Sequence, residues 1–112
     1  MGSPGPREDM DPLTVTATSA RGVVWIVVRG EVDLANHHHL RIRLAAIDLS
    51  AASVVYLDLR LLGFCDSAGC AILIRFQRQA AAAGCDVRIH RARPVVRKVL
   101  SLLGEPALGP LG

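Results

Sequence analysis

Hydrophobic residues in the first third of the chain follow the alternating or continuous patterns that are typical of β-strands. Residues 13–17 (Leu-Thr-Val-Thr-Ala) alternate apolar and polar side chains. Residues 23–28 (Val-Val-Trp-Ile-Val-Val) are apolar at every position, which predicts a strand buried on both faces that ends at a break over residues 30–33. The Arg-Gly pair between the two segments predicts a turn, so we expect an opening β-hairpin. Two shorter apolar segments, at residues 54–59 and 86–89, predict further strands.

Three later segments carry apolar side chains at the spacing of an α-helix. The first helix is expected at about residues 36–48, with Asn36 or Asp33 as its cap. The second is expected at about residues 67–83, where a following glycine favours a helix end. The third is expected at about residues 94–103, because proline is tolerated in a first helical turn.

These elements follow one another in the order β-β-α-β-α-β-α, with residues 60–65 as a connecting loop. Strands that alternate with helices predict crossover connections and parallel pairing, and the opening hairpin makes the sheet mixed. We therefore expect a single α/β domain with a mixed sheet of four to five strands and helices packed on it. Its expected limits are residues 12–104, between a flexible N-terminal arm at 1–11 and a short irregular tail at 105–112.

The composition and charge of the chain argue against some classes of function. The 112 residues are 51% hydrophobic and 21% charged, with a formal net charge of +3. The basic residues are spread out and are not interleaved with stacking aromatic residues, which argues against nucleic-acid binding. Three cysteines without framework spacing favour a reducing compartment. No signal-like or membrane-spanning run is evident, so the expected location is the cytoplasm, without membrane insertion.

Four short motifs resemble those of one known family. Residues 30–36 (Gly-Glu-Val-Asp-Leu-Ala-Asn) resemble the segment that leads into the first helix of STAS domains, the fold of bacterial anti-sigma-factor antagonists. Residues 56–59 (Tyr-Leu-Asp-Leu) resemble the strand before the switch loop, and residues 64–69 (Phe-Cys-Asp-Ser-Ala-Gly) resemble that loop. Residues 95–104 resemble the third helix with its Leu-Gly ending. The resemblance runs from about residue 13 to residue 104 and depends on the order and spacing of the motifs.

The resemblance implies a regulatory function without catalysis and without a cofactor. In that family, an anti-sigma factor that is also a serine kinase phosphorylates the motif serine, and the phosphorylated form no longer binds it. The resemblance makes Ser67 the phospho-acceptor, with Asp66 and Gly69 in the same motif and Asp33 and Asn36 in the neighbouring loop. The expected partners are such an anti-sigma factor and a phosphoserine phosphatase, and the chain is expected to be a monomer or weak dimer.

Some of these residues allow other interpretations. Ser67 could be a plain helix N-cap, because serine is favoured there. Arg75 and Arg78 are expected on the exposed side of the second helix, either as solvated residues or as part of the partner surface. Cys65 and Cys70 flank the serine and are candidates for a redox function, although structural cysteines are commonly buried and inert.

The residues present argue against two further classes of function, a metal-binding protein and an enzyme. Three consecutive histidines occupy residues 37–39, but successive helical residues point about 100° apart and do not converge on one ion, so no metal is expected. No glycine-rich phosphate loop, dinucleotide fingerprint or serine–histidine pairing is evident, so an enzyme is not expected. The alternative functions are a STAS scaffold subunit of a transport or stress-sensing complex, and a redox sensor based on Cys65.

Overall fold

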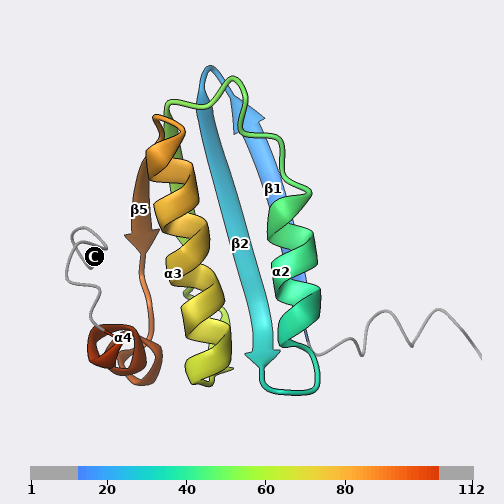
Figure 1. The fold of residues 1–112 in the computed structure, drawn as a ribbon, viewed down its shortest axis with the longest axis vertical. Coiled ribbons are helices and arrows are strands. Elements are labelled where there is room, and N and C mark those ends of the chain that lie inside the picture. The colour runs from blue at the N-terminus through green and yellow to red at the C-terminus, as the bar shows by residue number, and fades with distance from the viewer. Residues whose placement is uncertain (1–12, 104–112) are drawn as a thin grey trace, which may run out of the picture.

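The computed structural model describes residues 13–103, so the expected arm at 1–11 and tail at 105–112 lie outside the described residues. Within the described range the elements follow the order β-β-α-β-β-α-β-α (Figure 1). They are β1 (Leu13–Ala20), β2 (Val23–Val32), α2 (His37–Ala45), β3 (Val54–Asp58), β4 (Leu62–Cys65), α3 (Ser67–Ala82), β5 (Asp86–His90) and α4 (Pro94–Leu102). The order contains the seven expected elements and one further strand, β4.

The five strands form one mixed sheet, as the sequence predicts. β1 and β2 are the antiparallel hairpin, in which Leu13 lies opposite Gly30 and Ala20 lies opposite Val23. β2 pairs in parallel with β3, and β3 pairs in parallel with β5, so the order across the sheet is β1-β2-β3-β5. β4 lies off this path and pairs in parallel with the end of β2. Parallel neighbours need crossover connections, and α2 and α3 lie on them.

α2 and α3 lie side by side over one face of the sheet (Figure 1). The strand residues on that face are buried, among them Ile26 and Val28 in β2 and Leu57 in β3. Each such side chain contributes about 1.5–3 kcal/mol by leaving water. The helix residues buried in this core recur three or four positions apart, as the apolar spacing of the sequence predicts, and include Leu40, Leu44, Leu73, Phe76 and Ala80.

The other face of β2 is only half-buried, so the prediction of a strand buried on both faces is wrong. Val23, Trp25 and Val27 alternate with the buried positions and are each of intermediate exposure. The ring of Trp25 is covered by its neighbours on that face, with centroid distances of 4.9 Å to Tyr56 and 5.0 Å to His90. The apolar run therefore reflects one core face and one face on which aromatic rings cover each other.

β2 does not break at residues 30–33, and residues 60–65 do not form only a loop; both expectations are wrong. β2 runs to Val32, and its last residues pair with β4. Gly30 makes this possible, because its φ of +115° is a conformation that favours glycine and the register shifts directly after it. β2 thus pairs with β3 as far as Val27 and with β4 from Gly30 onward.

The helices end close to the predicted positions, except that α2 ends at Ala45 and not near Asp48. The backbone N–H of Ile47 donates to the carbonyl oxygen of Leu44 at 3.2 Å, a tighter turn that closes the helix. Ile47 still packs against the core from this turn. None of the helices within residues 13–103 is both long enough and apolar enough to cross a membrane.

Candidate functional site

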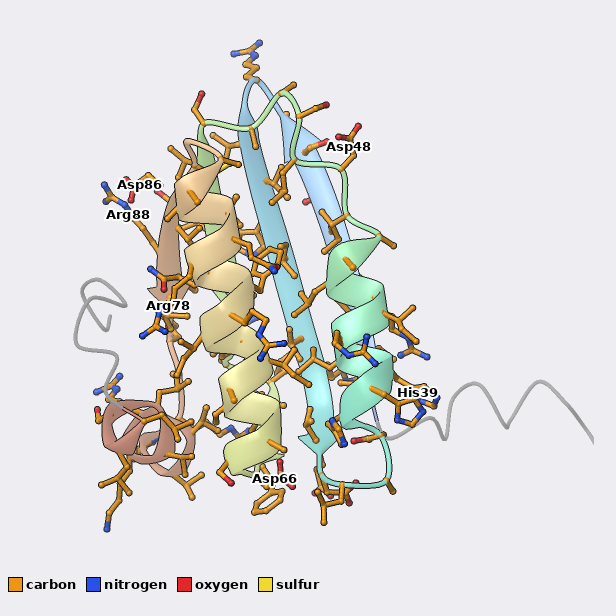
Figure 2. All side chains as sticks on the ribbon, viewed as in Figure 1. His39, Asp48, Asp66, Arg78, Asp86 and Arg88 are labelled. Atoms are coloured by element: carbon orange, nitrogen blue, oxygen red, sulfur yellow. The ribbon has the colours of Figure 1, made fainter. Side chains whose placement is uncertain are left out.

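The loop after β2 and the first turn of α3 meet at one edge of the sheet. β2 and β4 are parallel neighbours, with Val32 opposite Cys65 in the register. The backbone N–H of Asp66 donates to the carbonyl oxygen of Val32 at 3.1 Å, which ties the two strand ends together. Asp66 and the β2–α2 loop accordingly lie at the same end of the molecule (Figures 1 and 2). Two motifs that are about 30 residues apart in the chain thus become neighbours.

Asp66 is the N-cap of α3. Its backbone is extended, and its side chain accepts a hydrogen bond of 2.8 Å from the backbone N–H of Gly69. Ser67 is the first helical residue; its side chain is exposed and makes no hydrogen bond within residues 13–103. The interpretation of Ser67 as a plain N-cap is therefore wrong, because the neighbouring aspartate has that role.

Gly69 packs where no side chain would fit. It is buried, and a Cβ atom built on it would lie 2.6 Å from Cγ1 of Val32 and 2.7 Å from Sγ of Cys65. Real Cβ atoms do not approach other atoms this closely, so the residue allows α3 to start directly against the ends of β2 and β4. Gly69 therefore determines how closely the start of α3, which includes Ser67, packs against the two strand ends.

A hydrogen-bonded loop at residues 33–36 leads from β2 to α2. Oδ1 of Asn36 accepts from the backbone N–H of Asp33, and its Nδ2 donates to the carbonyl oxygen of Glu31, each at 2.9 Å. Oδ1 of Asp33 accepts from the backbone N–H of Ala35 at 2.9 Å. Asn36 is the N-cap residue of α2, as one of the two predicted alternatives has it, but its side chain makes no cap hydrogen bond and bonds within the loop and back to the strand. Asn36 is buried and fixes the loop, whereas Asp33 is exposed.

Two exposed apolar side chains lie at this edge. Leu34, in the loop, is 75% exposed, and Phe64, just before the start of α3, is 45% exposed. Glu31 lies opposite Phe64 in the β2–β4 register and is also exposed. Exposed apolar side chains that form a contiguous patch rimmed by polar ones are typical of interaction surfaces. Neither Leu34 nor Phe64 is among the residues predicted from the sequence, although each lies within one of the four motifs. The available signal was an apolar side chain inside a polar loop segment.

The exposed face of α3 is basic. Arg75 and Arg78 are exposed and share a side of the helix with Ser67, because residues three and four apart lie on one face. Arg75 is about 12 Å along the helix from Ser67. It borders two shallow grooves, one of about 210 Å³ shared with α2 and one of about 300 Å³ that also includes the end of α4. The three helices of the described chain contain no aspartate or glutamate, so this face is basic while the edge around Ser67 is acidic.

Comparison with known proteins identifies the family. A family model described as "Mlab, STAS domain" matches residues 15–107. The chain belongs to the STAS domain family. A search of curated protein sequences gives no match.

Solved structures share the STAS fold. An anti-sigma factor antagonist from Mycobacterium paratuberculosis superimposes with a TM-score of 0.76 at 22% identity, over 91% of this chain and 86% of that one. The Bacillus cell fate determinant SpoIIAA in its phosphorylated form gives 0.67 at 22% identity, over 88% and 91%. The murine anion transporter Solute Carrier 26 family member A9 gives 0.64 at 20% identity, over 78% of this chain and 14% of that one. At these identities the likeness establishes the fold alone.

The STAS domain also places two thiols together beneath the start of α3. Cys65, at the end of β4, is 3% exposed, and Cys70, in α3, is 0% exposed. Sγ of Cys70 lies 3.7 Å from the carbonyl oxygen of Cys65, and the two thiols hydrogen-bond to each other. This hydrogen bond raises the pKa of Cys65, with burial and the charges of Cys70 and Asp66 adding to the effect. The same hydrogen bond lowers the pKa of Cys70, against burial and Asp66. The third cysteine, Cys85, lies elsewhere, with its thiol 3.5 Å from the carbonyl oxygen of Ala52.

The three histidines lie at the start of α2 in the STAS domain. The rings of His38 and His39 lie with their centroids 4.2 Å apart and their planes tilted by 56°. Loss of hydration, followed by the charges of His39, His37 and Arg41, lowers the pKa of His38. Within residues 13–103 no group of three or more His, Cys, Asp or Glu side chains is arranged to hold a metal ion.

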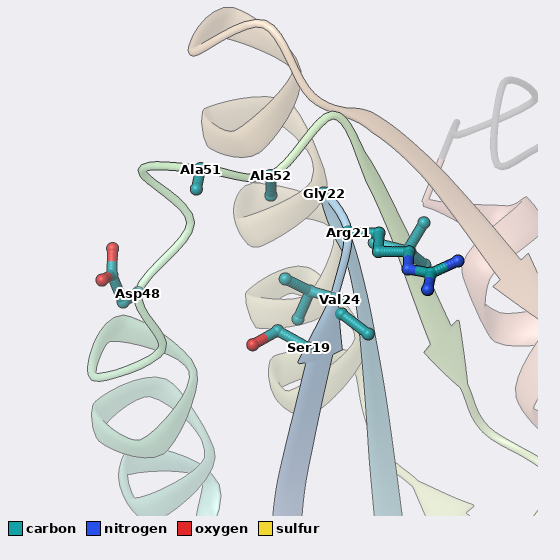
Figure 3. A pocket seen from close by; sticks show the side chains of 9 residues that line it. Ser19, Arg21, Gly22, Val24, Asp48, Ala51 and Ala52 are labelled. Atoms are coloured by element: carbon teal, nitrogen blue, oxygen red, sulfur yellow. The ribbon is translucent and has the colours of Figure 1, made fainter.

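A pocket of about 250 Å³ lies at the opposite end of the STAS domain (Figure 3). It is formed by the β1–β2 turn and the α2–β3 loop, and its charged residues are Arg21 and Asp48. The carboxylate of Asp48 accepts from the backbone N–H of Ser50 at 2.9 Å, and the guanidinium of Arg21 points away from it (Figure 3). The pocket has no converging charges and lies a full strand length from Ser67.

Proposed function

We propose that this STAS domain is an anti-sigma-factor antagonist that acts by partner switching. The unphosphorylated form binds an anti-sigma factor that is also a serine kinase, and phosphorylation of Ser67 releases it. A phosphoserine phosphatase returns the domain to its binding form. The domain is a non-enzymatic binding protein in this scheme and acts in the cytoplasm.

One observation at the start of α3 carries this proposal. Asp66 supplies the helix cap, so Ser67 is exposed and its hydroxyl has no structural task within the described residues. A phosphate at this position would lie at a helix N-terminus, where the helix dipole and the unpaired backbone N–H groups favour an anion. The domain can therefore accept the modification without losing its fold. The Bacillus relative, which shares the fold, was solved in a phosphorylated form.

Charge provides the release mechanism. Phosphorylation adds about −1.5 to −2 charges to the serine. The edge around it already carries Glu31, Asp33 and Asp66. A partner that buries the neutral hydroxyl of Ser67 would, after phosphorylation, have to desolvate a dianion near these carboxylates, which disfavours the complex. The switch is thus a local electrostatic change and needs no large rearrangement.

The proposed partner surface combines the edge of the sheet around Ser67 with the exposed face of α3. Asp33, Asp66 and Ser67 contribute at the edge of the sheet, and Arg75 and Arg78 contribute along α3. Asn36 and Gly69 are buried, and they act by holding the loop and the helix start in place.

A kinase assay tests the proposal. The purified chain is incubated with ATP and a candidate serine-kinase anti-sigma factor from the same genome, and the phosphosite is mapped by mass spectrometry. We expect one phosphate, on Ser67, and loss of the complex by size-exclusion chromatography once it is present. Ser19→Ala, an exposed serine on β1, is the matched control and should be phosphorylated like the wild type. Equal phosphorylation of Ser67→Ala would contradict the assignment.

A second candidate function is a scaffold subunit of a transport complex. The family model is described as "Mlab, STAS domain", and one structure of the same fold belongs to an anion transporter. In this case Ser67 would not need modification. Affinity capture from the native cell extract distinguishes the two, because a kinase-like anti-sigma factor supports the first function and a membrane transporter with its ATPase supports the second.

A further inference from the structure

The two buried cysteines of the site lie on either side of the proposed phospho-acceptor. Cys65 is the last residue of β4 and Cys70 lies in α3, so the four residues between them form the whole helix start. Sγ of Cys70 lies 3.7 Å from the carbonyl oxygen of Cys65, and Sγ of Cys65 lies against Gly69. Cys85, which is also buried, bonds to the carbonyl of Ala52 and takes no part in this pair.

We propose that Cys65 and Cys70 form a reversible disulfide that closes a ring around Ser67 and reduces its access to the kinase. The regulatory half of this proposal rests on the function proposed above, because it concerns the same serine. The formation of the disulfide is independent of that function. When the pair is reduced, the kinase can reach Ser67. When the pair is oxidised, this access is reduced.

A hydroperoxide is the oxidant that converts the two thiols to the disulfide. Cys70 attacks first as its thiolate, since the neighbouring thiol stabilises the negative charge. Its sulfur bonds to one peroxide oxygen, the O–O bond breaks, and water leaves once the second oxygen has taken a proton, which produces a sulfenic acid. The sulfur of Cys65 then attacks the sulfenic sulfur, and a second water leaves as the S–S bond forms. Two thiols and one hydrogen peroxide give one disulfide and two waters, with two electrons passing from sulfur to oxygen.

The disulfide would change the geometry of the helix start. Bonded sulfur atoms lie about 2.05 Å apart, closer than two hydrogen-bonded thiols, so the two side chains would rotate toward each other and pull the first turn of α3 toward the end of β4. Gly69 leaves little room for that movement, because it already touches Val32 and Cys65. The turn would therefore tilt, and the hydrogen bond between Asp66 and the N–H of Gly69 would weaken. Ser67 lies within this turn, so the orientation of its hydroxyl toward the kinase would change.

Thiol counting tests the first half of the proposal. The reduced chain is treated with hydrogen peroxide, unfolded, and alkylated with N-ethylmaleimide before its mass is measured. We expect one alkylated cysteine in place of three, and a peptide map that links Cys65 to Cys70. Cys85→Ser should keep the crosslink, whereas Cys65→Ser and Cys70→Ser should each lose it. Three alkylated cysteines after oxidation, or a crosslink that includes Cys85, would overturn the proposal.

Hydrogen exchange and phosphorylation test the second half. Loss of one helix cap corresponds to an equilibrium factor of about five, so the hydrogen-bonded amides of Gly69 and Cys70 should exchange about five-fold faster in the oxidised form. The initial rate of phosphorylation should fall by a similar or larger factor and recover with dithiothreitol. A crosslinked chain with unchanged exchange and unchanged phosphorylation would refute the regulatory role. If the crosslink and the faster exchange occur but Ser67 is never phosphorylated even when reduced, the proposed function fails while the disulfide and its structural effect stand.

Discussion

The carboxylate of Asp66 accepts a hydrogen bond of 2.8 Å from the backbone N–H of Gly69, and this contact separates two tasks at the start of α3. The aspartate satisfies the helix end, and the adjacent Ser67 is left exposed. Modification of the serine would therefore add charge without removing the hydrogen bond that caps the helix. A serine that capped its own helix would lose that role when phosphorylated.

Replacing Asp66 by alanine should lower the free energy of unfolding by about 1 kcal/mol, the usual cost of a lost N-cap. Asp66→Asn is the matched control, because an asparagine keeps an acceptor for the N–H of Gly69 and should lose less stability. Urea unfolding followed by the fluorescence of Trp25, the only tryptophan, measures both variants. An Asp66→Ala protein as stable as the wild type would show that the cap contributes nothing.

Gly69→Ala should also destabilise the domain, even though alanine favours helices. Alanine gains about 1 kcal/mol over glycine within a helix. Against this, the new Cβ would lie 2.6 Å from Val32 and 2.7 Å from Cys65, an overpacking that typically costs about 1–3 kcal/mol. Because both neighbours are buried and cannot move aside cheaply, we expect a net loss of stability.

Gly63→Ala serves as the control for this substitution. Its Cβ would lie 3.8 Å from the carbonyl oxygen of Gly30, which is an ordinary contact. We expect it to unfold in urea close to the wild-type midpoint. A Gly69→Ala variant that is as stable as Gly63→Ala would mean that the helix start can shift, and would weaken the case that Gly69 positions the site.

Local patterns predicted most of the fold, while the missing parts depend on contacts between distant segments. The hairpin, two parallel strands and three helices follow from apolar spacing, because each has one face in the core. β4 was not predicted, since residues 62–65 contain a glycine and become a strand only by pairing with the end of β2. Ser67 was placed at a helix start, but Asp66 is an equally good cap by type, and only the structure shows which one acts. The contact of Gly69 with Val32 has no local signal at all.

Ser67→Ala should leave the stability almost unchanged while abolishing the switch. The hydroxyl is exposed and has no hydrogen bond within the described residues, so the free energy of unfolding should change by less than about 0.5 kcal/mol. The same variant should bind the anti-sigma factor and persist in the complex when ATP is added. Urea unfolding and a binding assay with ATP are measured on one preparation. A loss of stability of 1 kcal/mol or more would indicate a structural task for this side chain.

Exchanging Arg75 and Arg78 for glutamate tests whether the partner contacts α3. Because the three helices carry no acidic side chain, a partner that binds this face should be acidic there. The double reversal should slow association about ten-fold at low salt, and the effect should shrink as ionic strength rises. Arg29→Glu is the control, since Arg29 is exposed on the sheet face away from the helices. Binding kinetics on an immobilised anti-sigma factor measure both rates. Equal slowing per charge in the two variants would mean that net charge sets the rate, and α3 would then not belong to the partner surface.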